Sequence, residues 1–424
     1  MLGAAATWTV PVFLEKTFLA LHAQAADALT QAVTGKDARI LVVLQLAGGN
    51  DGLNTVVPFA DDIYYRSRPK LGIPADKILK LDNYAGLNGK LTGLKSLFDE
   101  GHLAIVQGVG YPNPNRSHFR STEIWQTASD ADRNESEGWL GRYFDNCCSG
   151  ADPTVGVAIG EQMPQAFAAK NPTGVTFANP GQFRWLPSDK TSASAEETFF
   201  RQLNGLDEES SSAPNDGGSI GALAGPAKAE QSALDFLQRT ALDAQLSSEK
   251  ILAIARKYKS VVPYPEGQLA ASLSLIARMI AGGLPTRVYY ASQGGYDTHA
   301  GQSNAHDRLM GQLNDALAAF VSDLKQQGNF DRVLLMTFSE FGRRVAENAN
   351  DGTDHGAAAP MFVISGKVKP GVYGKYSSLS DLDHGDLKFN TDFRSVYGTV
   401  LEHWLGAPSK VVLGRKFSNL PIIA

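Results

Sequence analysis

Acidic and imidazole side chains recur in short polar motifs that are separated by long stretches of the sequence. Such groups are the ligands that Zn²⁺, Mn²⁺ and related divalent ions take in proteins. Several carboxylates brought to one place would repel one another and raise their pKa values, and a bound cation would relieve that repulsion. We therefore expect a divalent metal ion, with Zn, Mn, Mg and Ca as alternatives and the number of ions left open. The candidate ligands are Asp51, Asp297, His299, Glu340, Asp354 and His355.

A second set of residues could act on a substrate beside such an ion. Ser117 opens an expected helix, where backbone N–H groups favour an anion, and a nearby cation would favour its ionised hydroxyl. His118 could position this nucleophile or protonate the leaving group, or simply bond to the following loop. Arg120, one helical turn on, could hold a phosphate or sulfate in bidentate fashion, or form a surface salt bridge. The candidate substrate-binding residues are Asn50, Arg343 and Arg344.

Each of these residues, taken alone, has an ordinary structural explanation. An Asp after Gly-Gly-Asn is usually a turn or capping residue, and a Ser before a helix is usually an N-cap. A lone His is more often hydrogen-bonded structure than a metal ligand. The joint occurrence at the ends of separate strands favours a site, because ligands of parallel α/β sheets bind outside the carboxyl ends of the strands.

Five apolar runs are expected to form the strands that carry these motifs. The first, RILVVLQL, is continuous and ends in glycines, which is typical of a buried parallel strand followed by a functional loop. Helices between the strands predict an α/β fold, with a mostly parallel sheet covered by helices on both faces. The expected strands are Arg39–Leu46, Leu103–Val109, Thr286–Ser292, Arg332–Phe338 and Met361–Ser365, with helices near Ser117, Asn304–Gln327 and Phe393–Leu405.

The chain of 424 residues is long enough for one large α/β domain or two smaller ones. We expect residues 38–424 to form a single domain, with a partly helical insertion at about 131–284 around a low-complexity patch at 204–227. Residues 1–37 include a small apolar stretch and an Ala-Gln-Ala at 23–25 that looks like a signal-peptidase site. No basic region or twin arginine precedes it, so an amphipathic helix packed on the body is the alternative to a remnant export signal.

The composition excludes several kinds of protein. The net charge of −5 gives no electrostatic reason to expect nucleic acid as a partner. The two cysteines, Cys147 and Cys148, are adjacent, so they form neither a disulfide framework between distant segments nor a thiolate zinc site. No apolar run is long enough to span a bilayer, and the oligomeric state stays open.

Five motifs, in order, resemble domain-of-unknown-function family 1501. This family comprises largely uncharacterised bacterial proteins, often exported by the twin-arginine route, and is placed in the alkaline phosphatase-like superfamily alongside sulfatases. The resemblance runs from Arg39 to the end of the chain. The motifs are AGGNDGLNTVVP, NPNRSHFRSTEIWQTA, GGYDTHAGQ, MTFSEFGRRVAENANDGTDHGAAAPMFVISG and TDFRSVYGTVLEHWLG.

The resemblance implies an alkaline phosphatase-like fold and a role for each matching position. Asp51 resembles the ligand of the metal nearest the nucleophile, and Ser117 stands where the nucleophile opens its helix. Asp297 and His299 match the ligands of the other metal, and His355 matches the last histidine of the pattern.

Two departures from that pattern bear on the metal count. The superfamily normally has an Asp-His pair where this sequence has Glu340 and Phe341. Glu340 can replace the carboxylate, but Phe341 cannot replace the imidazole, and Asp354 is a candidate compensating ligand. The spacing from Asp297 to its histidine is also short, with His306 as a lower-ranked substitute. One metal, two metals or none all stay open.

The expected function is metal-dependent hydrolysis of a phosphate or sulfate ester, on a small molecule or a polysaccharide, with Ser117 as the nucleophile. SHFRS lacks the proline of the sulfatase modification motif, and no G-x-S-x-G elbow of a conventional serine hydrolase is present. The alternative is a non-catalytic exported binding or cell-envelope protein that keeps the fold. A remnant export signal would place the protein in the periplasm or outside the cell, and a structural N-terminal segment would leave it in the cytoplasm.

Overall fold

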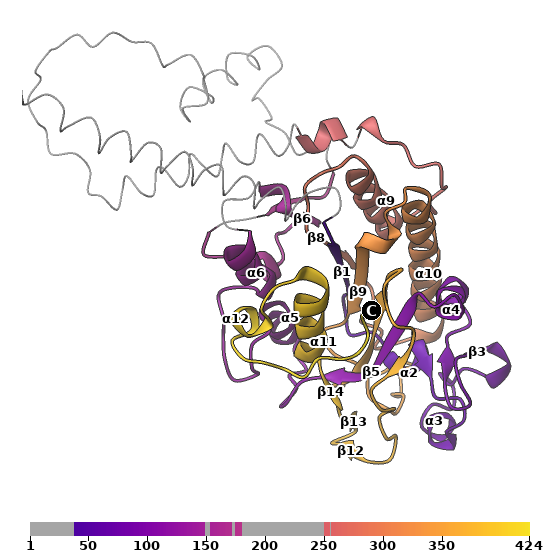
Figure 1. Cartoon of the computed structure of the whole chain (residues 1–424). Helices are drawn as coiled ribbons and strands as arrows, with labels where there is room; N and C mark the ends of the chain where they lie inside the picture. The colour runs from indigo at the N-terminus through magenta and orange to yellow at the C-terminus, as the bar shows by residue number, and fades with distance from the viewer. Residues whose placement is uncertain (1–37, 149–152, 172–173, 180–249, 255) are drawn as a thin grey trace, which may run out of the picture.

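A nine-stranded sheet forms the centre of the computed structural model, which describes residues 38–148, 153–171, 174–179, 250–254 and 256–424. The strands follow the order β11-β5-β10-β9-β1-β8-β6-β7, and β14 also pairs with β5 (Figure 1). Their bounds are β1 Ile40–Leu46, β5 Leu103–Gly110, β6 Gly156–Ile159, β7 Val175–Phe177, β8 Val288–Gln293, β9 Val333–Phe338, β10 Ala359–Ile364, β11 Gly371–Tyr373 and β14 Thr391–Asp392.

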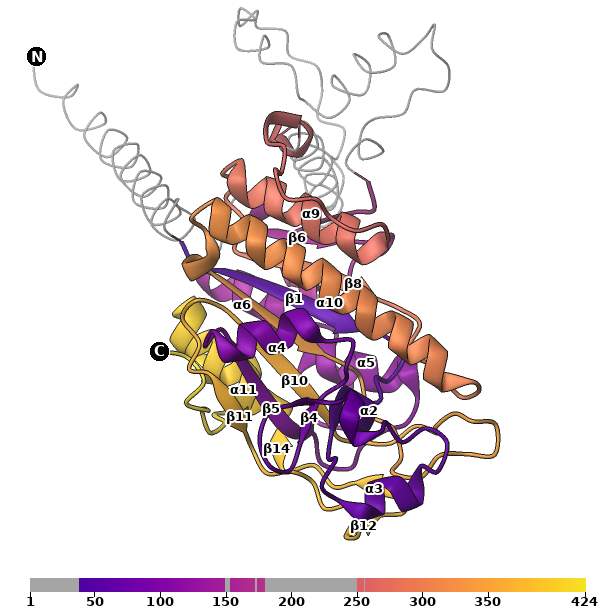
Figure 2. The same ribbon diagram turned by 90° about the vertical axis from the view of Figure 1, so that its right-hand side faces the viewer.

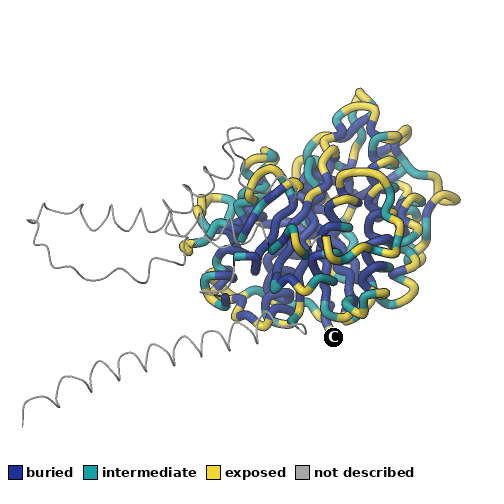
Figure 3. The backbone as a smooth tube through the Cα atoms, turned by 90° about the horizontal axis from the view of Figure 1, so that it is seen from above, coloured by how far each residue is buried: buried dark blue, intermediate teal, exposed yellow. Residues whose placement is uncertain are grey.

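The central strand β1 is apolar except at Gln45, because both of its faces are covered. Val42 and Leu44 pack into one hydrophobic cluster and Leu41 and Val43 into another, as the alternation of side chains in a strand requires. These clusters are the cores on the two faces of the sheet, and Figure 3 shows buried positions filling the interior while exposed positions lie on the outer loops.

Helices cover both faces of this sheet, as the sequence predicts for an α/β fold (Figures 1 and 2). One core is completed by α4 (Thr92–Asp99), α9 (Gln268–Ala281) and α10 (Gln302–Gln326). The other is completed by α5 (His118–Thr127), α6 (Trp139–Cys147), α11 (Phe393–Thr399), a π-helical turn at Val400–Leu405 and α12 (Ser409–Leu413). The mostly parallel sheet with helices on both faces is therefore confirmed.

One strand runs against the others. Strand β10 pairs antiparallel with both β5 and β9, whereas β1 pairs parallel with β8 and β9. The beginning of β10 therefore lies at the same edge of the sheet as the ends of β1, β5, β8 and β9. The polar segments that follow β1, β5, β8 and β9 meet at this edge with the segment that precedes β10.

Strands β6 and β7 lie inside the range 131–284, where the sequence analysis finds no strand. They have four and three residues, too few to give a periodic signal, and they extend the main sheet beside β8. The export signal expected in residues 1–37 and the patch at 204–227 lie outside the described residues. Whether 131–284 is an insertion stays a prediction.

Small elements complete the edge around the motifs. They are α2 (Gly52–Thr55), α3 (Asp62–Ser67), a small sheet of β2 (Val56–Val57), β3 (Leu79–Lys80) and β4 (Gly86–Leu87), and the pair β12 (Leu382–Asp383) and β13 (Asp386–Leu387). Among the helices of the described ranges, none combines the length and the apolar character needed to cross a membrane.

Candidate metal centre

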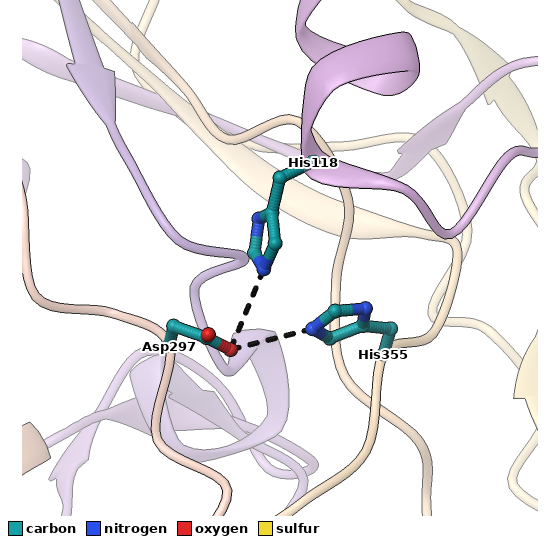
Figure 4. A group of neighbouring side chains, drawn as sticks. All are labelled: His118, Asp297 and His355. Carbon is teal, nitrogen blue, oxygen red and sulfur yellow. Dashed lines mark hydrogen bonds and ion pairs between the residues drawn. The ribbon is translucent and has the colours of Figure 1, made fainter.

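Three imidazole nitrogens converge on one carboxylate oxygen at this edge of the sheet. The Nε2 atoms of His118, His299 and His355 lie 3.5, 3.1 and 3.3 Å from Oδ1 of Asp297. Figure 4 shows the rings of His118 and His355 pointing at Asp297 from two directions. The Nε2 atoms of His299 and His355 are themselves 2.9 Å apart. These four residues are called the His₃Asp cluster below.

The cluster is assembled from three separate segments. His118 is the first residue of α5, reached through the turn after β5. Asp297 and His299 follow β8, and His355 lies four residues before β10. The loop after β1 packs against the second of these segments: a Cβ on Gly48, whose φ is +118°, would lie 2.5 Å from the backbone nitrogen of Asp297. Only glycine therefore allows the two loops to approach so closely.

Each ring of the cluster has its other nitrogen, Nδ1, beside an oxygen atom. His118 Nδ1 lies 2.8 Å from Oε1 of Glu340, and His355 Nδ1 lies 2.7 Å from the carbonyl oxygen of Arg116. Because both oxygens can only accept, Nδ1 carries the proton in each ring and Nε2 keeps a free lone pair. His299 Nδ1 is 3.6 Å from Asp354, a longer contact. Such outer partners orient metal-binding histidines and fix their tautomers.

The cluster fits a divalent ion. Ligand atoms about 2.0–2.1 Å from a tetrahedral Zn²⁺ lie roughly 3.3 Å from one another. The three distances to Oδ1 of Asp297 are 3.1–3.5 Å, and the ligand atoms of His118, Asp297 and His355 all lie within 4.8 Å of one another. Nε2 of His118 is buried and has no hydrogen-bond partner among the described residues. Burial lowers the pKa of His355, although its bonds to the Arg116 carbonyl and Asp297 oppose this, so the ring is in the neutral form that binds metals.

Arg343 lies behind the cluster and is not accessible to a substrate. Its fully buried guanidinium donates to Oδ1 of Asp297 at 2.8 Å and to backbone carbonyls that include those of Gly49 and Thr353. Burial raises the pKa of Asp297, but the hydrogen bond and charge of Arg343 and the bond to His355 outweigh it and lower the pKa to about 2. Arg343 thus ties three loops together and keeps Asp297 ionised, rather than offering its donors outward.

Asp51 lies outside the cluster, in a buried ion pair. Its Oδ2 is 2.6 Å from Nη1 of Arg68, with neither side chain exposed, and Gln302 donates to the same oxygen. Oδ1 caps α2 by accepting from the backbone of Leu53 and Asn54. Burial raises the pKa of Asp51, but the charge and hydrogen bond of Arg68 prevail and lower it. The neighbouring cation in the described structure is therefore a guanidinium, and a metal-ligand role for Asp51 stays a prediction.

Glu340 and Asp354 stand behind the histidines rather than between them. Oε1 of Glu340, on a side chain only 3% exposed, accepts from both His118 and the backbone of Gly48. Asn50 faces inward, where its Oδ1 contacts the buried ring of His306 at 3.1 Å and accepts from Thr55.

Phe341, at the position where the resemblance implies a histidine, lies beside the cluster. Its buried ring lies 4.8 Å from the ring of His118 and 4.6 Å from that of His355, centroid to centroid. A Cβ on Gly49 would lie 2.3 Å from this ring. Phe341 therefore forms an apolar wall of the cluster and offers no ligand atom on that side.

The nucleophile candidate is exposed next to the cluster. Ser117 is the N-cap residue of α5, but its hydroxyl does not cap the helix and forms no hydrogen bond with the described residues. Arg120 forms a salt bridge with Glu123 at 2.8 Å, which is the alternative to anion binding that the sequence allows. It also donates to carbonyls of the loop at 130–133. Arg344 is partly exposed and lies 3.4 Å from Asp386.

Two arginines that the sequence analysis did not select are important here. Arg68 neutralises Asp51, and Arg116 orients His355 through its carbonyl and pairs with Asp386 at 2.6 Å through its side chain. Arg68 belongs to no motif, so nothing in the sequence marks it. Arg116 precedes Ser117 in the motif NPNRSHFR, and that proximity is the signal that could have identified it.

Replacing Glu340 with glutamine should weaken metal binding without removing a ligand atom. Losing the carboxylate that orients a metal-binding imidazole typically costs about 10–100-fold in affinity. We expect a loss of that size for Glu340→Gln, measured by competition with a chromogenic chelator. Asp354→Asn, at the longer contact to His299, serves as a matched control with a smaller loss. Equal metal affinity in Glu340→Gln and the unmodified protein would show that Glu340 does not orient His118 for metal binding.

The buried His306 should make the protein less stable in mild acid. Burial lowers its pKa, with opposing and smaller effects from Asp51 and Asp307. Below about pH 6.5 the unfolded chain then binds a proton that the folded protein does not, so stability falls by up to about 1.4 kcal/mol per pH unit down to the folded pKa. Urea unfolding at several pH values should show a shallower fall for His306→Gln. The exposed His403→Gln should keep the original slope, and parallel profiles for all three proteins would contradict the prediction.

None of the curated proteins to which the sequence was compared matches it. Among solved structures, the PsFucS1 sulfatase from Pseudoalteromonas sp. is similar at 12% identity, with 94% of this chain and 74% of that chain covered and a TM-score of 0.37. The phosphonate monoester hydrolase SpPMH from Silicibacter pomeroyi is similar at 10% identity, with 90% of this chain and 78% of that chain covered and a TM-score of 0.34. A protein in the alkaline phosphatase superfamily from Vibrio parahaemolyticus is similar at 9% identity, with 92% of this chain and 77% of that chain covered and a TM-score of 0.36. Similarity at this level carries no argument about activity.

A family model covers most of the chain. It matches residues 104–395, which contain the whole His₃Asp cluster, Ser117 and Glu340. Its description is "Protein of unknown function (DUF1501)", so the match assigns no activity. The chain belongs to this DUF1501 family.

Proposed function

We propose that the protein is a metal-dependent hydrolase of phosphate or sulfate esters, acting on a small molecule or a polysaccharide. The observation that carries the proposal is the convergence of three imidazole Nε2 atoms on Oδ1 of Asp297, within 3.1–3.5 Å. Side chains from three distant segments meet there, and His118 and His355 direct the unprotonated nitrogens of their rings inward.

The His₃Asp cluster would hold the ion, with Glu340 and the Arg116 carbonyl keeping His118 and His355 in the ligand tautomer. A divalent ion in this place supplies Lewis-acid stabilisation of charge on the transferring group. Arg343 keeps Asp297 ionised, and Phe341 limits access of water from one side. The donor set, imidazole with one carboxylate, suits Zn²⁺ or Mn²⁺ better than Ca²⁺ or Mg²⁺.

Ser117 is the proposed nucleophile. It is exposed, its hydroxyl forms no hydrogen bond with the described residues, and it directly precedes His118 of the cluster in the sequence. Its Oγ would attack phosphorus or sulfur as the bond to the leaving oxygen breaks, the serine proton is lost and the leaving alcohol gains one. Water would then cleave the seryl ester and restore the hydroxyl. The first-turn N–H groups of α5 would face the anion in both steps.

Arg116 and Arg344 are the proposed contacts for the anionic part of the substrate. Their side chains are 42% and 36% exposed, and both lie beside the buried carboxylate of Asp386. Asp386 holds the two guanidinium groups at the same side of the loop that precedes Ser117. Arginine suits this task because its planar donors match phosphate and sulfate oxygens.

A non-catalytic binding protein is the second candidate. Two observations favour it: Phe341 replaces an imidazole, and the guanidinium groups of Arg68 and Arg343 already neutralise Asp51 and Asp297. In such a protein the cluster would hold a structural ion or a hydrogen-bonded group of rings. An exported protein that binds a cell-envelope component would need no turnover.

The test combines metal analysis with generic aryl phosphate and aryl sulfate esters. We expect Ser117→Ala to lose roughly a thousandfold or more of the turnover while keeping its metal content, since nucleophile removal has effects of that order. Ser96→Ala, an exposed serine of α4, is the matched control and should be unchanged. Unchanged turnover in Ser117→Ala would remove the serine mechanism, and bound metal with no turnover on either ester would favour the second candidate.

A further inference from the structure

A cavity of about 410 Å³ is lined by residues at the carboxyl ends of β6 and β7 and by helix α9. Strands β6, β7 and β8 are parallel, so these ends lie at the same edge of the sheet as the end of β8, which leads to Asp297. Ligands of parallel sheets bind outside such ends, and small-molecule sites commonly measure roughly 300–1,000 Å³. No residue of the His₃Asp cluster lines this cavity, so it is a separate candidate site.

Helix α9 presents one face to the cavity. Gln268, Ala271, Ser272 and Arg278 line it, and Gln268, Ala271 and Ser272 are spaced by the three or four residues that place side chains on one side of a helix. Ser272 is only 8% exposed, yet its hydroxyl forms no hydrogen bond with the described residues. A nearly buried hydroxyl is normally bonded, so this one is available to a ligand in the cavity.

Two guanidinium groups line the cavity without a carboxylate partner. Arg256 forms no ion pair or hydrogen bond with the described residues, and Arg278 bonds there only through Nε, to the carbonyl oxygen of Tyr258 at 3.2 Å. No Asp or Glu lines the cavity, and Glu161 and Glu266, within two residues of the lining in the sequence, pair with neither arginine. Guanidinium groups match the oxygens of carboxylate, sulfonate and phosphate groups, so the cavity is suited to an anion.

The segment that carries Arg256 adds to this positive charge and is anchored to the body. Residues 250–260 contain three lysines besides Arg256 and no acidic residue, in a chain of net charge −5. The hydroxyl of Tyr258 is bonded to Oδ1 of the buried Asp323 at 3.0 Å. Because this bond fixes Tyr258, whose carbonyl holds Arg278, the guanidinium of Arg278 is positioned before a ligand arrives.

Apolar side chains form another part of the wall. Ile159 ends β6, Leu275 lies on α9, and Leu252 belongs to the segment of Arg256. An inorganic anion would leave these side chains uncovered, whereas an anion with an apolar chain or ring would remove them from water.

We propose that this cavity binds an organic oxyanion that carries an apolar group. Arg256 and Arg278 would hold its carboxylate, sulfonate or phosphate head, and the hydroxyl of Ser272 would donate a further hydrogen bond. Its apolar part would contact Ile159 and Leu275. The inference is independent of the ester hydrolysis proposed above, because the cavity shares no residue with the metal cluster, the proposed nucleophile or the proposed anion contacts.

Four small probes, titrated into the full chain by calorimetry, test the two halves of this ligand. Hexanesulfonate has both halves and no ester bond to hydrolyse, methanesulfonate has only the head, 1-hexanol has only the chain, and hexanoate replaces the sulfonate with a carboxylate. We expect hexanesulfonate or hexanoate to bind saturably and the two half-probes to bind at least about tenfold more weakly. No binding of either organic anion, or equal affinity for 1-hexanol or methanesulfonate, overturns the proposal.

Substitutions of the arginines assign the binding to this cavity. Arg256→Gln and Arg278→Gln should each weaken binding of the organic anion at least about tenfold, since each removes a charged donor. Arg256 is exposed, so its variant should keep the melting temperature of the unmodified protein. Arg308→Gln, at an exposed arginine of α10 outside the lining, is the matched control and should bind normally. Undiminished affinity in both cavity variants overturns the proposal.

Filling the cavity gives a test that keeps both arginines. Ala271→Trp places a large ring at an exposed position of the lining and should abolish binding of the organic anion. Ala253→Trp, at an exposed position of the helical segment 250–254 that does not line the cavity, should bind as the unmodified protein does. Equal binding by Ala271→Trp and the unmodified protein would place the anion elsewhere and would contradict the assignment.

Discussion

His355→Ala is expected to release the divalent ion. The Nε2 atom of His355 lies 2.9 Å from Nε2 of His299 and 3.3 Å from Oδ1 of Asp297. Loss of an outer carboxylate alone costs up to about 100-fold in affinity, and loss of a ligand nitrogen should exceed that. Metal content after gel filtration, measured by mass spectrometry, should fall from stoichiometric to background.

Thermal unfolding provides a second measurement of the same change. A ligand present at a hundred times its Kd stabilises the folded state by about 2.7 kcal/mol. The unmodified protein should therefore melt at a higher temperature with metal than with a chelator, and His355→Ala should melt at the same temperature in both. His403→Ala, an exposed histidine outside the cluster, should behave as the unmodified protein does. Full metal content in His355→Ala would show that the cluster is not the binding site.

Arg68→Met should be among the most destabilising single substitutions in the described part of the chain. It leaves the carboxylate of Asp51 buried without its cation, and breaking a fully buried pair in this way costs about 3–5 kcal/mol. Arg68 also donates to the carbonyls of Val345 and Arg344, so the substitution removes two hydrogen bonds that hold the loop between β9 and β10. Urea unfolding at pH 7 measures the loss. Lys70→Met, in an exposed pair with Asp351, should cost less than about 1 kcal/mol.

The stability lost in Arg68→Met should depend on pH. In the unmodified protein Arg68 lowers the pKa of Asp51, so the contribution of the pair is present at neutral pH and is lost only as the pH falls through that lowered pKa. Without Arg68, burial, which raises the pKa of Asp51 and is the largest influence on it, is opposed only by the smaller effects of His306 and Gln302. The deficit of Arg68→Met should therefore shrink between pH 7 and pH 5, as Asp51 takes up a proton. A deficit that stays constant over this range would contradict the assignment of the cost to the unpaired charge.

Asp51→Asn distinguishes the two roles considered for this residue. If Asp51 is a metal ligand, the substitution lowers the metal content; if it is the partner of Arg68, the metal content stays and the stability falls. The buried pair leads us to expect the second result.

The sequence predicts the framework of the site well because the relevant strands are long and apolar. The ends of β1, β5, β8 and β9 were each expected within two residues of where they lie, and the polar residues after them do meet. The antiparallel direction of β10 was not predicted, since a buried apolar run looks the same in either direction. The convergence survives because Asp354 and His355 precede that strand instead of following it.

Side-chain partners were harder to predict than strand ends. Motif spacing gives no information on Arg68, which reaches Asp51 from α3 and its following loop, outside every motif. Asp297, His299 and His355 were expected as ligands and lie together, whereas His118 was expected to act on the substrate and instead directs a ring nitrogen at Asp297. Rotamers decide this difference, and they depend on contacts such as that between His118 and Glu340.

The reversed direction of β10 has a consequence for how the chemistry of this protein can vary. Since β9 ends and β10 begins at one edge, a single connection, residues 339–358, joins them without crossing the sheet. That connection carries Glu340, Arg343, Arg344 and His355 together. Substitutions within this one segment therefore affect the anion contact at Arg344 and the histidine cluster together, so specificity and metal binding are expected to vary in concert.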